Sequence, residues 1–137
     1  MTKGLTAIAI QAYTTASSLG VLDELKQLHK SHAPGIGDLT TNGLIGMPPK
    51  AYRWVAEMQE IATTMRDDGG FEGKGGALFD EIAQTYDLVA YETELGKEKT
   101  EDRKRGLSSE DVAVLVKEGN AKRLKKNTGL QQQHNGN

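Results

Sequence analysis

The residues of this chain that could do chemistry are two histidines, several carboxylates and two glycine-rich segments. His29 and His32 lie three positions apart, a spacing that could place both rings on one helix face and allow metal binding. No third ligand lies nearby and Pro34 follows, so we predict solvent-facing histidines and no metal site. The chain has no cysteine, which excludes disulfides, thiolate metal sites and a cysteine nucleophile.

The carboxylates and glycines give no stronger signal. Glu57 and Glu60 could pair as acid and base, but nothing in the pattern buries them, so we predict a solvated face. The glycine groups at 35–37 and 69–76 match neither the dinucleotide fingerprint nor the Walker pattern, and they follow no predicted strand. On residue chemistry alone we assign no catalytic residue.

Length and composition indicate one domain with a modest core. The chain has 137 residues, of which 36% are hydrophobic and 5% aromatic, low values that predict a loosely held or unfolded part. The formal charge of −2 gives no electrostatic reason to expect nucleic acid or a membrane as a partner. No apolar run is long enough to span a bilayer, so we expect a cytoplasmic protein.

The spacing of apolar residues predicts an all-α fold of about five helices. Apolar side chains recur every three or four residues and nowhere alternate in twos, so we predict no sheet. The predicted helices cover residues 2–19, 21–32, 47–65, 77–92 and 109–118. Gly20 has the position of a helix C-terminal cap, and we predict that the segment 47–65, with the single tryptophan, is the central helix.

The remaining segments are predicted to be irregular. Residues 38–46 form a polar loop of no predictable fold, and residues 93–106, dense in charge, form a solvated linker. Ser108 and Asp111 resemble a capping box at the start of the last helix. We therefore expect a helical domain over residues 1–118 and a disordered, basic and glutamine-rich tail over 119–137.

Three segments in order resemble a known family. They are TKGLTAIAIQAYTTASSLGVLDEL, PPKAYRWVAEMQEIATTM and GGALFDEIAQTYDLVAYETELG. The first is similar to the start of the helical C-terminal domain of the β-hydroxyacid dehydrogenases. The set more closely resembles the putative C-terminal domain of NAD-binding 6-phosphogluconate dehydrogenase-like proteins. The resemblance covers about residues 2–117.

The resemblance implies the C-terminal substrate and dimerisation domain of an NAD(P)-dependent oxidoreductase. In the family, the catalytic lysine lies about two helical turns before the position of Thr2, and a separate Rossmann domain binds NAD or NADP. Neither is found in this sequence. We therefore expect that this chain alone binds no cofactor and has no dehydrogenase activity.

Four residues are site candidates through this resemblance. Positions matching Thr2 and Lys3 lie on the active-site side of the long helix, so these residues are substrate-binding candidates. Arg53 and Glu57 match a helix that faces the cofactor cleft and are cofactor-binding candidates. The alternatives are a frayed N-terminal Lys3 and an exposed i, i+4 ion pair between Arg53 and Glu57.

The first helix is the predicted interaction surface. In the family it packs between domains and often against a second subunit, so Leu5, Ile8 and Ala12 would be exposed in an isolated domain. We expect a homo-oligomer, or a separate Rossmann domain, to contact this helix. The alternative function is a non-catalytic helical protein-interaction module.

Overall fold

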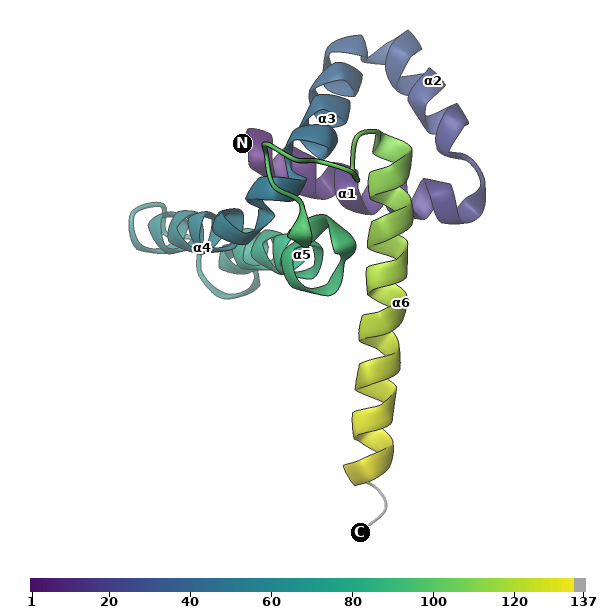
Figure 1. The fold of residues 1–137 in the computed structure, drawn as a ribbon. Coiled ribbons are helices and arrows are strands. Elements are labelled where there is room, and N and C mark those ends of the chain that lie inside the picture. The colour runs from purple at the N-terminus through teal and green to yellow at the C-terminus, as the bar shows by residue number, and fades with distance from the viewer. Residues whose placement is uncertain (135–137) are drawn as a thin grey trace.

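A computed structural model describes residues 1–134, apart from the side chains of Lys74 and of 129–134. Within this part the chain forms six α-helices, shown in Figure 1, and no β-strand, which confirms the all-α class. Lys99 and Asp102 form an isolated bridge. The α-helices are α1 (Thr2–Leu19), α2 (Leu22–His32), α3 (Pro34–Gly46), α4 (Ala51–Asp67), α5 (Leu78–Glu92) and α6 (Ser109–His134), and the 3-10 helices are η1 (Pro48–Lys50), η2 (Gly73–Ala77) and η3 (Glu94–Lys97).

Helix α1 is the centre of the fold. It contacts α2, α3, α5 and α6, and it buries Ala7, Ile10 and Tyr13 to 2% exposure or less. The prediction that the helix over 47–65 is central is wrong, because α4 packs chiefly against α5. The small residues around α1 let several helices approach it closely, whereas α4 has one extensive helical neighbour, α5.

The predicted C-terminal cap at Gly20, between α1 and α2, is confirmed. Gly20 has a φ of +74°, a left-handed conformation that glycine adopts without steric cost. Its N–H and that of Val21 donate to the carbonyls of Ser17 and Ala16, which would otherwise lack partners at the helix end. Helix α2 therefore begins directly after this turn.

Helix α3 replaces the loop expected over residues 38–46. Its glycines give it low intrinsic helix propensity, so tertiary packing stabilises the helix. Leu44 is fully buried and Thr40 is 3% exposed. A Cβ at Gly43 would lie 2.4 Å from the Thr6 hydroxyl oxygen, so the glycine is what allows α3 to lie against α1.

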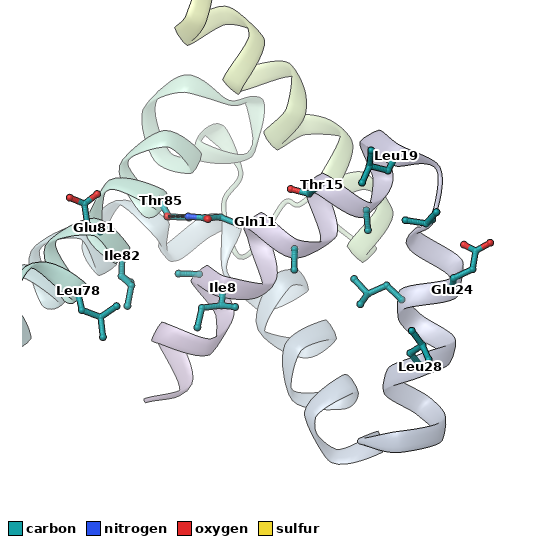
Figure 2. A pocket seen from close by; sticks show the side chains of 15 residues that line it. Ile8, Gln11, Thr15, Leu19, Glu24, Leu28, Leu78, Glu81, Ile82 and Thr85 are labelled. Carbon is teal, nitrogen blue, oxygen red and sulfur yellow. Dashed lines mark hydrogen bonds between the residues drawn. The ribbon is translucent and has the colours of Figure 1, made fainter. Parts of the chain in front are cut away.

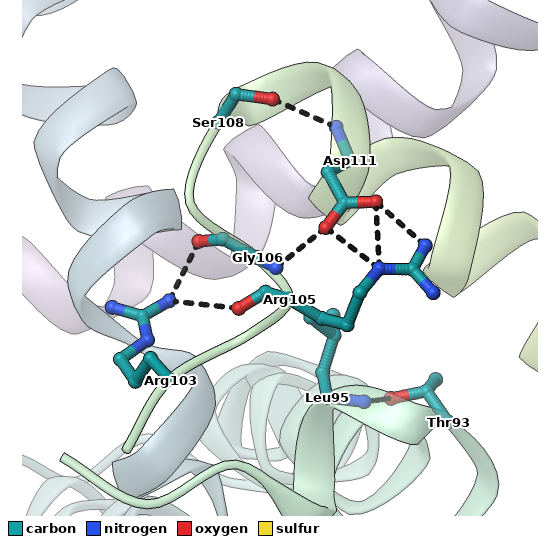
Figure 3. A network of polar contacts seen from close by, with 7 residues as sticks. All are labelled: Thr93, Leu95, Arg103, Arg105, Gly106, Ser108 and Asp111. Carbon is teal, nitrogen blue, oxygen red and sulfur yellow. Dashed lines mark hydrogen bonds and ion pairs between the residues drawn. The ribbon is translucent and has the colours of Figure 1, made fainter. Parts of the chain in front are cut away.

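The segment between α5 and α6 is more ordered than the predicted solvated linker, and Figure 3 shows its polar contacts. Leu95 is fully buried, and the N–H of Leu95 donates to the Thr93 hydroxyl at 3.1 Å. The Arg103 guanidinium donates to the carbonyls of Ile45 and Gly106 at 2.5 and 2.6 Å. The prediction of a solvated linker was based on the density of charged residues, so it missed the packing of the single buried apolar residue, Leu95.

Ser108 caps the start of α6 as predicted, but the Asp111 carboxylate does not bond back to Ser108. The Asp111 N–H donates to the Ser108 hydroxyl at 3.1 Å, whereas its carboxylate accepts from the Gly106 N–H at 2.6 Å and from Arg105 at 2.7 Å. The hydrogen bond from Arg105 lowers the pKa of Asp111. The start of the helix and the preceding loop are thus fixed together.

Helix α6 is longer than predicted. The sequence indicated an end near Glu118 and a disordered tail from residue 119, but the helix continues to His134, so the predicted end is wrong. Residues 135–137, the end of that tail, lie outside the described residues. Figure 1 shows α6 leaving the helical body and projecting beyond it. The predicted boundary between 118 and 119 therefore falls within one continuous helix.

Candidate functional site

The first turn of α1 meets α4 at a charged and aromatic cluster. The Lys3 ammonium forms an ion pair with the Glu57 carboxylate, 54 positions away in the sequence. The Lys3 Nζ also lies 5.1 Å from the centre of the Trp54 ring, a distance at which a cation is attracted to the ring face. Both charged side chains are about one-third exposed, so the cluster lies at the surface.

Tyr86 of α5 contacts this cluster from the interior of the protein. Its ring packs edge-on to Trp54, with centroids 5.2 Å apart and planes at 87°. Its hydroxyl donates to the Lys3 backbone carbonyl, and burial raises the pKa of the phenol. Tyr86 thus fixes both the backbone of the first turn and the ring beneath the Lys3 ammonium.

The structure brings two of the four predicted site residues together. Lys3 and Glu57 are in contact, whereas Thr2 and Arg53 are exposed and form no side-chain hydrogen bond or ion pair with the described residues. The alternative Arg53–Glu57 ion pair is wrong, because Glu57 pairs with Lys3. The alternative of a frayed Lys3 is also wrong, since α1 is helical from Thr2. The binding roles of all four residues remain predictions.

Sequence reasoning missed the aromatic pair. The apolar spacing places Trp54 on the inner face of its helix, but it gives no sign that Tyr86, on another predicted helix, would support the same site. The only hint in the sequence was that Tyr86 lies on the apolar stripe of its own helix, which predicts burial but not its neighbours. A buried tyrosine needs a partner for its hydroxyl, and that partner is a backbone carbonyl that a sequence pattern does not identify.

A large apolar groove follows the outer face of α1, and Figure 2 shows it between α5 and α2. Its volume is about 860 Å³. Apolar side chains on its floor and walls are exposed, including Ile8 at 62%, Leu19 at 72% and Leu78 at 61%. Of the predicted stripe, Ile8 and Ala12 are exposed and line the groove, and Leu5 is half-buried.

Polar groups along the groove are few. Gln11 on the floor donates to the Thr85 hydroxyl at 3.1 Å. Glu24 of α2 and Glu81 of α5 lie on opposite sides of α1 in Figure 2. Both carboxylates are on exposed residues and pair with no described cation. The groove is therefore an apolar surface with an acidic group on each wall.

The histidines do not form a metal centre. Among the described residues, no three His, Cys, Asp or Glu side chains are grouped to hold a metal ion. His29 is half-buried, so its predicted exposure is wrong: its Nδ1 lies 3.4 Å from the buried hydroxyl of Tyr13. His32 is exposed as predicted and its Nδ1 lies 2.7 Å from the Ser31 hydroxyl.

Comparison with known proteins places the chain in a family. The family model described as "Domain of unknown function (DUF1932)" matches residues 16–89, more than half of the chain, so the chain belongs to this family. It is the domain found at the C-terminus of NAD-binding 6-phosphogluconate dehydrogenase-like proteins, which confirms the resemblance. Searches of curated proteins and of solved structures found no match.

The matched range covers part of both candidate surfaces and leaves out Lys3 and most of α1, the floor of the groove. It includes α2 and α4, nearly all of α5, and the end of α1, which together form the groove walls and the site of Glu57. Within residues 1–134, no helix combines the length and the apolarity needed to cross a bilayer.

Proposed function

We propose that this chain is the substrate and dimerisation domain of an NAD(P)-dependent 6-phosphogluconate dehydrogenase-like oxidoreductase. The family supports this class of protein. The observation on which the proposal rests is the contact of Lys3 with Glu57 beside Trp54. Residues that the resemblance assigns to the substrate side and to the cofactor side thus lie at one surface cluster.

In this function Lys3 is the anion-binding group. Its ammonium is already placed at the surface by Glu57 and by the Trp54 ring, so little side-chain entropy is lost when an anion binds. A carboxylate or phosphate of the substrate would share or replace Glu57 as the partner of Lys3. The free hydroxyl of Thr2 would donate to the same anionic group.

The dinucleotide would be bound by a separate domain. The described residues contain no strand, and hence no strand–turn–helix unit of the kind that binds a dinucleotide pyrophosphate, so they do not fit this cofactor alone. A bound NAD(P) supplies the hydride chemistry. The exposed Arg53 of α4 is then free to contact the cofactor or the domain that holds it. By itself the chain would be inactive.

We assign a different proposed partner to each of the two surfaces of α1. Its first turn, with Lys3, would face the dinucleotide-binding domain, and its groove would face a second copy of the chain. Exposed apolar surface of this extent is typical of interaction sites.

Reconstitution tests the proposal. The chain is mixed with the separately produced dinucleotide-binding domain of a family member, and NAD(P)H formation is followed with a panel of phosphorylated and carboxylated hydroxy acids. We expect turnover in the mixture and none in either part. Lys3→Met should raise the KM for an anionic substrate at least tenfold. A matched Lys99→Met change, at an exposed position between α5 and α6, should leave KM unchanged.

A protein-interaction module is the second candidate function, and the apolar groove favours it. Tight binding of the two parts with no turnover on any substrate would support the module and contradict the oxidoreductase role. No binding of the dinucleotide domain, or turnover that is insensitive to Lys3→Met, would contradict the proposed site.

A further inference from the structure

A small polar pocket lies at the corner where α2 and α3 meet, a corner that Figure 1 shows. Its lining includes Tyr13 of α1, Lys26, His29 and Lys30 of α2, and Asp38 of α3. The apolar groove is lined by other residues of α2, which lie on the opposite side of that helix. The polar pocket is therefore separate from the groove, and neither candidate surface uses it.

The size of the pocket restricts what can bind there. Its volume is about 240 Å³, which is below the range of about 300–1,000 Å³ that is usual for drug-sized ligands. A Cβ at Gly37 would lie 3.0 Å from the His29 Cβ, so the glycine lets α3 pass close to α2 and keeps the corner narrow. The pocket suits a compact molecule and not a dinucleotide.

The buried end of the pocket contains a tyrosine hydroxyl with distant partners. Tyr13 is 1% exposed, and its hydroxyl lies 3.4 Å from both the His29 Nδ1 and the Thr40 hydroxyl. Both distances exceed the usual range of about 2.5–3.0 Å for a hydrogen bond between oxygens, or about 3.2 Å with nitrogen. The Thr40 hydroxyl donates to backbone carbonyls of α3 at 2.9 and 3.0 Å, so it can only accept. The Tyr13 hydroxyl can therefore donate to a closer acceptor in the pocket.

Two opposite charges at the exposed side of the pocket are unpaired. Lys30 and Asp38 are both exposed, and neither forms an ion pair with a described side chain, including one another. Lys26, by contrast, is paired with Glu110. A simple anion near Lys30 would also meet the negative charge of Asp38. A molecule with one charge of each sign can pair with both residues at once.

We propose that this pocket binds a small zwitterion of the amino acid class. The carboxylate of the ligand accepts from the Lys30 ammonium and the Tyr13 hydroxyl, and the ammonium of the ligand donates to Asp38. Complementary charges of this kind give specificity for a molecule that has both groups. Tyr13 lies about 15 Å further along α1 than Lys3, so the site is independent of the proposed oxidoreductase role.

Three molecules of similar shape test the charge pairing. L-Alanine has both charges, propionate lacks the ammonium and ethylamine lacks the carboxylate. Binding to the full chain is followed by NMR titration of the backbone amides. We expect saturable shifts at the α2–α3 corner with L-alanine, and dissociation constants about tenfold higher or more for the other two molecules. Propionate that binds as tightly as L-alanine would indicate a simple anion site and overturn the proposal, as would no saturable binding of L-alanine.

Substitutions in the pocket test its residues. Lys30→Met and Asp38→Asn should each raise the dissociation constant of L-alanine about tenfold or more. Tyr13→Phe keeps the ring and should raise it about threefold or more. The matched controls are Lys125→Met and Asp68→Asn, at exposed positions on other helices, which should leave it unchanged. Circular dichroism verifies folding. Equal losses in the controls, or folded pocket variants that bind L-alanine as the wild type does, would overturn the proposal.

Two further measurements separate this site from the Lys3 cluster. L-Alanine has no hydroxyl group to oxidise, and Lys3→Met should leave its dissociation constant unchanged. Because the ligand joins α2 to α3, saturating L-alanine should slow hydrogen exchange in these two helices and leave α4 and α5 unchanged. Weaker binding in Lys3→Met, or slower exchange confined to α4 and α5, would place the ligand elsewhere and overturn the proposal. Turnover in the reconstituted mixture is a separate readout.

Discussion

The α4–α5 pair and the α2–α3 pair are attached to the molecule in different ways. In the first, large side chains such as Met58, Tyr86 and Val89 are buried to 1% exposure or less. In the second, α2 buries one residue, Leu22, and α3 buries Thr40 and Leu44. Elements with few buried apolar contacts open locally at a lower free energy. We therefore expect α2–α3 to open before α4–α5.

The contacts of α2 with the body combine a small apolar part, Leu22 and Leu25, with two polar ones. Lys26 forms an ion pair with Glu110 of α6, and His29 lies 3.4 Å from the Tyr13 hydroxyl. Helix α2 is also one wall of the groove, whereas α5, the other wall, belongs to the more deeply buried α4–α5 pair. We therefore expect α5 to be the more stable wall of the groove and α2 the wall that opens more readily.

The largest expected effect is the destabilisation of the α4–α5 pair by Tyr86→Ala. This change leaves a cavity between α4 and α5 and removes the hydrogen bond to Lys3, so it should lower the free energy of unfolding by about 3–5 kcal/mol. Urea denaturation measures this value. Tyr52→Ala, at a 59% exposed position of α4, is the control and should change it by less than about 0.5 kcal/mol. Equal effects at the two positions would contradict the conclusion that the packing between α4 and α5 stabilises the fold.

A smaller effect is expected where α3 touches α1. The methyl group in Gly43→Ala would meet the Thr6 hydroxyl, so we expect a loss of about 1–3 kcal/mol in spite of the higher helix propensity of alanine. Thermal unfolding with a double mutant of Gly43→Ala and Thr6→Ala sharpens the test, because the second change removes the clash. No recovery in the double mutant would show that this contact does not limit the approach of α3.

The opposite sign is expected at the other end of α3. No atom lies within 4 Å of a Cβ at Gly35, so Gly35→Ala should stabilise the protein by up to about 1 kcal/mol through helix propensity alone. Hydrogen exchange should show slower exchange in α3 with no change in α4 or α5. A uniform change across all helices would mean that α3 does not open separately from the rest.

The smallest effect concerns pH. The hydrogen bond from Lys26 lowers the pKa of Glu110 to about 2, from 4.5. The carboxylate therefore stabilises the folded state above pH 4.5, and this contribution is lost as the pH falls toward 2. Because the pair is partly exposed, its full value is at most about 1 kcal/mol. The difference between wild type and Glu110→Gln in urea denaturation should shrink between pH 5 and pH 2.5. A constant difference would exclude the ion pair as its cause.

Most of the helices could be predicted from periodicity, because their buried residues recur at helical spacing. Helix α3 could not, since its glycines are unfavourable in a helix and its stability comes from contacts with Thr6 and Tyr13 that lie far away in sequence. The segment around Leu95 was missed for a similar reason: one buried apolar residue leaves no periodic signal among many charges.

The candidate site could be predicted only in part. The resemblance indicated Lys3 and Glu57 separately, and the structure shows that they form an ion pair. It did not indicate the Tyr86 support or the carboxylates on the groove walls, because these depend on the angles at which helices pack.

The continuity of α6 has a consequence for how its sequence can change. Because one unbroken helix contains both the buried Val112 and Val116 and the exposed Leu124, its inner half sets the rotational phase of its outer half. Inserting one residue between the halves would rotate Leu124 by about 100° around the helix axis, whereas inserting four would nearly restore its direction. A substitution at Leu124 thus leaves the core unchanged, whereas insertions are constrained to near-complete turns.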